Sequence, residues 1–540
     1  MLQILLVFVI ETWLVEHLCY LTHVSCSIGR GIMSATVQSI ISMGSSGIIV
    51  DIECHLSNNL PNIVIVGFAN KAVDEAKERI RGAFADSHIE LPRKRITVNL
   101  APADIPKADS GFDLAIAVAI LLASEQIPSS FDRSHAFIGE LGLDGSTRAV
   151  RGIIGKLMIG RTKAINTFFI SRANLVQAQL VPGINLIPID NLQQLYNYCN
   201  NIAKITPVKT GNGHYDETLK PENSGVQLSE VVGQLQAKRA LTIAAAGGHN
   251  VFFSGPPGTG KSMLAKSLAS IMPALNHEEV LEVTYLHSLA SHDYEQIITA
   301  RPFRAPHHSA SHVAVIGGGL SLRPGEISLA HRGVLFFDEL PEFERQTLEA
   351  LRQPLEDRVI TIARAKDTAE YPANFILVAT ANPCPCGYYG TSGTCRCLPH
   401  QIIRYRQKLS GPILDRIDLF SDVNEIKHDK LLTTGIDTES DDVVRVAIIN
   451  ARSKQAKRYG LSNKLNADMT NADIKKHSHL DSEAVELLNI AAAKLKISAR
   501  SYMRSVKVAR TIADLDSSDI VTVAHISEAL AYRGQSYKEL

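Results

Sequence analysis

The sequence lacks several features that would place it in a specialised class of protein. Its 55 Lys plus Arg balance its 55 Asp plus Glu, so net charge predicts no polyanionic partner. We find no internal repeat and no low-complexity tract. Hydrophobic residues make up 45% and charged residues 20%, which is the mixture of a globular protein. At roughly 100–200 residues per domain, the 540 residues predict about three domains.

An apolar run long enough to cross a membrane is missing from the start of the chain. The first nine residues, MLQILLVFV, are apolar, whereas a bilayer-spanning helix needs about 20. They also lack the positive region and the small-residue cleavage site of a secretory signal. An alternating pattern begins only after Met33. We therefore interpret residues 1–32 as a leader that comes from an upstream start codon, and we expect no membrane contact.

Cysteine is scarce outside one short segment. Four of the eight cysteines are scattered, and four crowd into fourteen residues: Cys384, Cys386, Cys395 and Cys397. This is not the framework of a small secreted domain, and it favours a reducing cytoplasm. Four thiolates in a tight loop could hold Zn²⁺ tetrahedrally, although C-x-C spacing is less usual than C-x₂-C. Free thiols or a redox-sensitive loop are the alternatives.

Charge is uneven along the neutral chain. Residues 451–510 contain 13 Lys or Arg and 5 Asp or Glu, an excess of 13 − 5 = 8. A local basic face of this kind can bind nucleic acid even when the whole protein is neutral. A solvated helical surface is the alternative.

Apolar periodicity divides the chain into three structured regions. Residues 33–205 predict an N-terminal α/β domain with strands at 48–52, 63–66, 96–100 and 136–138 and helices at 73–84 and 113–122. Residues 206–227 have the composition of a linker. Residues 228–425 alternate apolar strands (251–253, 334–337, 375–379) with helices, which favours a parallel sheet covered on both faces. Residues 426–540 predict a helical domain, with helices at 484–496, 500–515 and 524–529.

A phosphate-binding loop follows the first of these apolar strands. The pattern GxxxxGK[ST] is matched in full by Gly255, Pro256, Pro257, Gly258, Thr259, Gly260, Lys261 and Ser262. The glycines let backbone N–H groups turn toward phosphate oxygens, and the helix that follows adds partial positive charge. We expect Lys261 to reach the β- and γ-phosphates of ATP and Ser262 to hold Mg²⁺. A glycine-rich turn without a ligand is the alternative.

Two further strands end in polar residues that complete this site. Asp338 and Glu339 follow the apolar run 334–337. We expect Asp338 to bind Mg²⁺ and Glu339 to polarise the attacking water; an exposed acidic strand end is the alternative. Asn382 follows the third strand, where it would orient the water or simply begin an Asn-Pro turn.

These motifs resemble the ComM/YifB group of magnesium-chelatase-like AAA+ ATPases over residues 33–533. The matching segments are GPPGTGKS (255–262), FRAPHHSASHVAVIGGG (303–319), PGEISLAHRGVLFFDELPEF (324–343), NPCPCG (382–387), LSGPILDRID (409–418) and SARSYMR (498–504). The resemblance implies an α/β fold in which a P-loop AAA+ core with a parallel sheet lies between two other domains. These are an N-terminal Lon-protease-like (ribosomal S5-like) α/β domain and a C-terminal helical lid.

The resemblance also assigns roles to arginines. Arg416 resembles the arginine finger that enters a neighbouring subunit's site, which implies a homo-oligomeric ring, namely a hexamer. Arg500 resembles the sensor-2 arginine of the lid, with Arg504 and Arg510 as rivals. Surface ion pairs are the alternative for these arginines.

Two segments occupy the places where related helicases carry insertions that grip DNA in the pore of the ring. They are residues 301–322 and a predicted hairpin at 357–372. Arg358, Arg364 and Lys366 are the candidates for contacts with DNA phosphates, which are independent of sequence.

The N-terminal domain departs from the protease pattern that it resembles. A Gly-x-Ser segment carries the nucleophile in that fold, but the corresponding segment here is Gly111-Phe112-Asp113. Lys156 lies in a helix that resembles the one carrying the protease lysine. We predict no peptidase activity, and we expect Asp113 to serve packing or subunit contact.

The combined interpretation is a ring-shaped, ATP-driven DNA motor. The resemblance implies branch migration of recombination intermediates during natural transformation, on branched or single-stranded DNA of any sequence. A chelatase-like ATPase that remodels a partner protein is one alternative, although no DxSxS metal-ion-adhesion domain follows the lid. A non-catalytic module whose ATP site only switches shape is another, and Glu339 and Arg416 argue against it.

Overall fold

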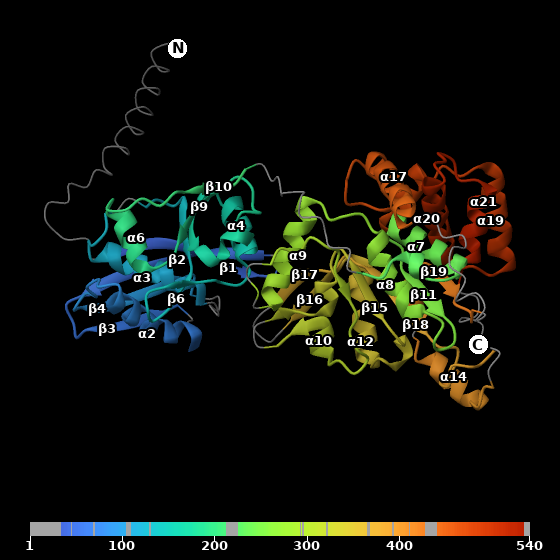
Figure 1. The fold of residues 1–540 in the computed structure, drawn as a ribbon, viewed down its shortest axis with the longest axis horizontal. Helices are drawn as coiled ribbons and strands as arrows, with labels where there is room; N and C mark the ends of the chain where they lie inside the picture. The colour runs from blue at the N-terminus through green and yellow to red at the C-terminus, as the bar shows by residue number, and fades with distance from the viewer. Residues whose placement is uncertain are drawn as a thin grey trace, which may run out of the picture.

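The protein is described here from a computed structural model. It covers residues 34–44, 46–67, 71–103, 110–128, 131–211, 225–291, 293, 296–319, 322–363, 368–390, 394–409, 411–426 and 440–533. Two large sheets lie next to each other along the long axis, and a helical bundle stands at the C-terminal end (Figure 1). Within the described ranges, no helix combines the length and apolarity needed to cross a bilayer. The predicted leader lies outside these ranges.

The N-terminal sheet is mixed, with the strand order β10-β9-β8-β5-β1-β2-β4-β3. A long antiparallel hairpin of β1 and β2 stands at its centre, and β5, β8 and β9 continue the sheet parallel to β1. All four predicted strands of this half are confirmed. The bounds are β1 (Ser34–Met43), β2 (Ser46–Ser57), β3 (Asn62–Val66), β4 (Arg95–Ala101), β5 (His135–Ile138), β8 (Thr167–Ser171), β9 (Asn185–Ile189) and β10 (Val208–Lys209).

Helices cover both faces of this sheet. α2 (Lys71–Asp86) and α3 (Asp113–Ala123) belong to the core of one face, and α4 (Ile153–Thr162) belongs to the core of the other. Every residue of α3 is buried, because the helix is apolar all round after Asp113 and contacts β1, β2 and β5 as well as α2. The second core continues into α9 (His277–Ala290), which thereby joins the two halves of the chain.

The second sheet is parallel throughout, with the strand order β12-β15-β18-β11-β19. Helices α7 (Leu235–Gly247) and α8 (Lys261–Ile271) pack on one face, and α12 (Arg345–Ala350) and α13 (Arg352–Asp357) pack on the other. The predicted parallel sheet with two covered faces is confirmed. The strands are β12 (Phe303–Arg304), β15 (Val334–Phe337), β18 (Ile376–Ala381), β11 (Val251–Ser254) and β19 (Leu419–Asp422).

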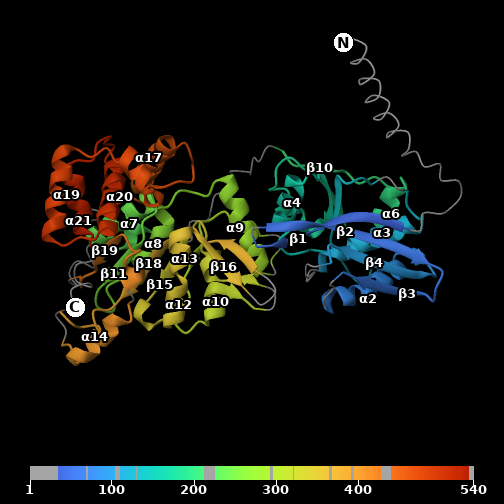
Figure 2. The same cartoon turned by 180° about the vertical axis from the view of Figure 1, so that it is seen from behind.

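The two predicted insertions differ in what they form. Part of segment 301–322 is β12, the edge strand of the sheet, so it is not wholly an insertion. The predicted hairpin is confirmed as β16 (Val359–Ala363) and β17 (Thr368–Pro372), which Figure 2 shows beside α13. Its β17 strand contacts the β1–β2 turn, because a Cβ on Gly44 would stand 2.4 Å from the carbonyl oxygen of Glu370. Arg364 and Lys366 lie outside the described residues.

The C-terminal bundle packs on α7 and α8, and its three predicted helices are confirmed. Its basic excess does not form a single outer face. Arg458 and Arg510 both pair with the buried Asp514, and Arg452 donates to the carbonyl of Ala245. The helices are α17 (Asp441–Tyr459), α18 (Asn471–His477), α19 (Ser482–Lys494), α20 (Ala499–Leu515) and α21 (Val523–Ala531).

Candidate functional site

The candidate site lies where the carboxyl ends of β11, β15 and β18 meet at one edge of the parallel sheet. The loop between β11 and α8 forms its floor. Gly258 (φ +79°) and Gly260 (φ +87°) take the left-handed backbone conformation that favours glycine, and the space where their Cβ atoms would stand is open. This loop therefore leaves room for backbone N–H groups to surround a phosphate, as the sequence predicts.

Lys261 is drawn into the site by three oxygen acceptors. Its Nζ lies 2.7 Å from the carbonyl oxygen of Gly255, 2.8 Å from that of Pro256 and 3.0 Å from Oδ1 of Asn382. Burial lowers the pKa of Lys261, while the carboxylates of Asp338 and Glu339 raise it. Phosphate oxygens would be stronger partners for this ammonium than neutral carbonyls, because charge-assisted hydrogen bonds are about twice as strong.

Four residues from α8, from β18 and from the segment directly after β15 form a connected polar network beside Lys261. Ser262 Oγ donates to Asp338 Oδ2 over 3.0 Å, and Thr380 Oγ1 donates to Asp338 Oδ1 over 2.6 Å. The backbone N–H of Glu339 donates in turn to Thr380 Oγ1 over 3.0 Å. Thr380, which is fully buried, is a residue that the sequence analysis missed. Its signal was a hydroxyl residue near the end of an otherwise apolar strand.

The oxygens of Ser262 and Asp338 suit a hard divalent cation. Hydroxyl and carboxylate oxygens are the ligands that Mg²⁺ uses beside substrate phosphates. These two side chains already lie within hydrogen-bond distance of each other, so they would hold Mg²⁺ without a large rearrangement. Bound Mg²⁺ would neutralise charge on the phosphates during transfer.

Glu339 faces the open side of the site. Its Oε1 accepts a hydrogen bond from Asn382 Nδ2 over 3.3 Å, so Asn382 connects Glu339 to Lys261. The backbone of Glu339 is left-handed (φ 52°), which is strained for a residue with a Cβ. This arrangement suits a carboxylate that orients and deprotonates a water in front of a phosphate.

The structure does not bring Arg416 and Arg500 to this edge. Arg416 precedes β19 and therefore lies at the opposite, amino-terminal edge of the parallel sheet. Its Nη2 and that of Arg500 each lie 2.5 Å from Oε1 of Glu356, and Arg416 is the leading cause of the lowered pKa of Glu356. The three side chains line a cavity of about 720 Å³ together with Arg504 and Lys507.

Two other arginine predictions need correction. Arg510 is 1% exposed and lies inside the bundle against Asp514, so it is no rival to Arg500. Arg358 lies at the base of the hairpin, where it pairs with Asp468 over 3.0 Å and donates to the carbonyl of Phe375 over 3.2 Å. The Arg358 guanidinium, which was predicted to contact DNA phosphates, is thus engaged in contacts within the chain.

Asp113 serves packing in the N-terminal half. It is 1% exposed and accepts two hydrogen bonds from Arg79, over 2.7 Å and 3.1 Å, and one from the N–H of Leu141. Burial raises the pKa of Asp113 to about 6, against the opposing effect of Arg79. The carboxylate therefore fixes α2 to α3.

Comparison with known proteins places three segments of the chain in one family. Family models match residues 227–431 (magnesium chelatase, subunit ChlI), 52–174 (subunit ChlI of Mg-chelatase) and 438–533 (magnesium chelatase, subunit ChlI C-terminal). A more distant relative, the magnesium-chelatase 38 kDa subunit of Rhodobacter capsulatus, is 27% identical over 191 residues, which cover 31% of this chain and 54% of the relative.

Two relatives are similar over nearly the whole chain. The competence protein ComM of Haemophilus influenzae is 43% identical over 505 residues, which are 92% of this chain and 97% of the relative. The uncharacterized protein YifB of Escherichia coli is 41% identical over 506 residues, which are 92% of this chain and 96% of the relative. The chain thus belongs to the ComM/YifB family of magnesium-chelatase-like AAA+ proteins.

Proposed function

We propose that this chain is an Mg²⁺-dependent ATPase that assembles into a hexameric ring in the cytoplasm and moves branched DNA. The observation that carries the ATPase part is the connected set of Lys261, Asn382 and Glu339 beside Ser262 and Asp338. These residues supply a phosphate-binding cation, a water-polarising carboxylate and cation-binding oxygens within one network. Phosphoryl transfer needs such positioning and charge stabilisation more than covalent chemistry.

The ring part of the proposal is supported by the opposite placement of the arginines. Lys261 follows the carboxyl end of β11, whereas Arg416 precedes the amino end of β19, its parallel neighbour. A chain cannot bring both to one phosphate across its own sheet. A closed ring of head-to-tail contacts joins two different surfaces of neighbouring subunits, so it can place the Arg416 edge of one subunit against the Lys261 edge of the next. Arg416 and Arg500 would then stabilise transition-state charge in the neighbour's site.

The DNA part is supported by the similarity to the relatives over nearly the whole chain. ComM of Haemophilus influenzae carries the name of a competence protein, and competence is the uptake of external DNA. We propose branch migration of recombination intermediates as the corresponding work of this chain. The contacts with DNA would be to phosphates and therefore independent of sequence.

The decisive experiment is steady-state ATPase of the full chain with no DNA, single strands, duplex or a four-way junction. We expect stimulation by DNA that is largest with the junction, together with ATP-dependent conversion of a labelled junction to its products. Glu339→Gln protein from the same preparation measures the background. If none of these DNA forms raised the ATPase rate, the proposal of a DNA motor would be overturned.

A chelatase-like ATPase that remodels a partner protein is the second candidate. It is favoured by the family models, which describe magnesium-chelatase subunits over all three segments. An ATPase rate that is the same with and without every form of DNA, but rises when a protein fraction is added, would favour this candidate.

A further inference from the structure

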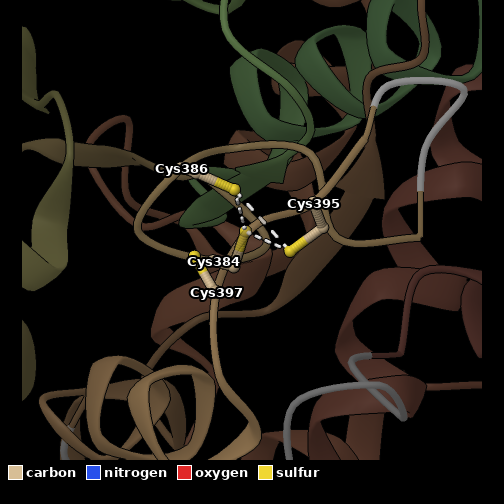
Figure 3. A group of neighbouring side chains, drawn as sticks. All are labelled: Cys384, Cys386, Cys395 and Cys397. Atoms are coloured by element: carbon tan, nitrogen blue, oxygen red, sulfur yellow. Dashed lines mark hydrogen bonds between the residues drawn. The ribbon is translucent and has the colours of Figure 1, made fainter.

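Four thiols from two separate segments converge beside the phosphate loop. Cys384 and Cys386 follow β18, and Cys395 and Cys397 precede α14 (Pro399–Gln407). Figure 3 shows the four side chains turned toward a common centre. Their sulfur atoms all lie within 4.8 Å of one another, although Cys384 is buried and the others are half-buried. Neither the catalytic network nor the proposed DNA contacts use these residues.

The distances between the sulfurs fit a shared metal. Sγ of Cys384 lies 3.3 Å from that of Cys386 and 3.8 Å from that of Cys395, and the latter two are 3.6 Å apart. A disulfide would need about 2.05 Å. A tetrahedron of four sulfurs with metal–sulfur bonds of about 2.3 Å has edges of roughly 3.8 Å. We propose that Cys384, Cys386, Cys395 and Cys397 bind one Zn²⁺ as a structural site that supports the phosphate loop.

The backbone around the first pair of cysteines is shaped as a turn that directs N–H groups to sulfur. Gly387 has φ +88°, which a residue with a Cβ rarely adopts, and its N–H donates to the carbonyl of Cys384 over 2.9 Å. The N–H of Tyr389 then points to Sγ of Cys384 over 3.3 Å. Donors of this kind stabilise the negative charge of a thiolate, which is the form that binds a metal.

The ligand set decides the role of the metal. Four protein thiolates fill all four positions of a tetrahedral zinc ion, leaving no position for water or substrate. Such a site contributes to folding rather than to chemistry. Since cysteine sulfur prefers soft or borderline metals, Mg²⁺ and Ca²⁺ are excluded as occupants of these four thiolates.

The proposed metal would fix the phosphate loop from one side. A Cβ on Gly387 would stand 2.6 Å from Cδ of Pro257, so the cysteine turn lies directly against that loop. Cys384 also follows Asn382, the partner of Lys261, by two residues. Arg406 of α14 donates to the carbonyl of Pro383 over 3.4 Å and lies 5.3 Å from the ring centre of Tyr389. The metal thus anchors Asn382, Pro257 and α14 together.

The metal content of the purified full chain tests the site itself, independently of the proposed function. Protein purified without added metal is analysed by elemental mass spectrometry, before and after dialysis against Zn²⁺. We expect about one zinc per chain, lost in Cys384→Ser/Cys395→Ser. The matched control, Cys54→Ser/Cys199→Ser, removes two buried thiols far from the site and should keep the zinc. A wild-type chain without zinc after dialysis, or equal zinc in both variants, would overturn the proposal.

A second measurement covers the case in which the serine variant fails to fold. The wild-type chain is titrated with a mercurial that displaces zinc, and the metal released is followed with a chromogenic chelator. Release of one zinc as four thiols react supports the site, and zinc that appears before any thiol reacts contradicts it. Replacement by Co²⁺ should give the visible absorption of a tetrahedral thiolate complex.

The part of the proposal in which zinc supports the phosphate loop rests on the proposed ATPase function. It is tested separately, by measuring nucleotide affinity. Binding of a fluorescent ATP analogue is compared in the native chain, the chelator-stripped chain and the stripped chain resupplied with Zn²⁺. We expect a loss of affinity that zinc reverses. Unchanged affinity in a chain proven to lose its zinc would limit the metal to a local role, contradicting the support proposed here but not the ATPase.

Discussion

Glu339 combines a strained backbone with a side chain that accepts a long hydrogen bond from Asn382, over 3.3 Å. Replacing it with Gln keeps the shape but removes the base, so we predict a fall in kcat of about 10²–10⁴-fold. Binding of an ATP analogue should be retained, because Lys261 and the glycine loop are untouched. The control is Glu342→Gln, an exposed carboxylate paired with Lys408. Loss of nucleotide binding in Glu339→Gln would show that its role has been misassigned.

The hydroxyl of Thr380 connects both acidic residues of the site. Thr380→Val preserves volume but removes the donor to Asp338 Oδ1 and the acceptor of the Glu339 N–H, while Ser262 still donates to Asp338 Oδ2. Losing a hydrogen bond to a charged group costs about 1.5–3 kcal/mol. We therefore predict a fall in kcat/KM of roughly ten- to a hundredfold, measured by ATPase over a range of Mg²⁺ concentrations. Thr380→Ser should stay near wild type, and a Val variant with full activity would contradict the role.

Single site residues can be predicted from the sequence when they belong to a local motif whose neighbouring residues are recognisable. Lys261, Asp338 and Glu339 come from local patterns whose flanking strands are visible as apolar runs. The hydroxyl of Thr380 was visible at the end of an apolar strand, but its role was missed because that role depends on a hydrogen bond from β18 to Asp338, which follows the neighbouring strand β15. Arg358 was misread for the same reason, since its partner Asp468 is 110 residues away.

Helix α20 depends on an ion-pair cluster inside the C-terminal bundle. Arg510 donates to Asp514 over 2.9 Å and to the carbonyl of Asp519 over 2.8 Å, and both side chains are almost fully buried. Arg510→Met removes one of the two arginines that pair with the buried carboxylate of Asp514. Removing one partner of a buried ion pair costs about 3–5 kcal/mol of stability. We predict a clear fall in the thermal midpoint of unfolding. Lys494→Met on the neighbouring α19 is the control, and equal midpoints would contradict the cluster's role.

Whether a helix or strand could be predicted depends on how clear the apolar pattern of its sequence is. The strands β11, β15 and β18 were predicted because central parallel strands are continuous apolar runs. The two-residue edge strand β12 was not predicted, since Phe303–Arg304 is too short to show a period and joins the sheet by pairing with β15. The excess of Lys and Arg in the bundle predicted a more basic surface than the structure has, because helical spacing turns several of these arginines inward.

The whole molecule has two unlike edges on its parallel sheet. One edge carries Lys261 and Glu339, and the other carries Arg416 and Arg500 at a cavity of about 720 Å³. Arg416 therefore lies at the opposite edge from Lys261 of the same chain. The number of subunits could not be predicted from composition or periodicity, since neither describes how the two edges meet between copies. The resemblance to ring-forming proteins supplied that expectation.

Mixing two inactive variants tests whether a site is shared between neighbouring subunits. Lys261→Ala disables the phosphate loop and Arg416→Ala disables the proposed finger, so each protein alone should hydrolyse little ATP. In a random mixed ring, roughly a quarter of the interfaces join an intact Lys261 to an intact Arg416 of the neighbour. We predict that mixing restores ATPase to about that fraction of wild type.

The control for this experiment keeps the oligomer but removes every intact interface. Lys261→Ala mixed with the double variant Lys261→Ala/Arg416→Ala has no chain with a working phosphate loop, so it should stay inactive. Light scattering on each mixture checks that rings still form. Mixed rings that form but regain no activity would mean that Arg416 acts within its own chain or not at all. In that case its contact with Glu356 would be structural, holding the region before β19 against α13.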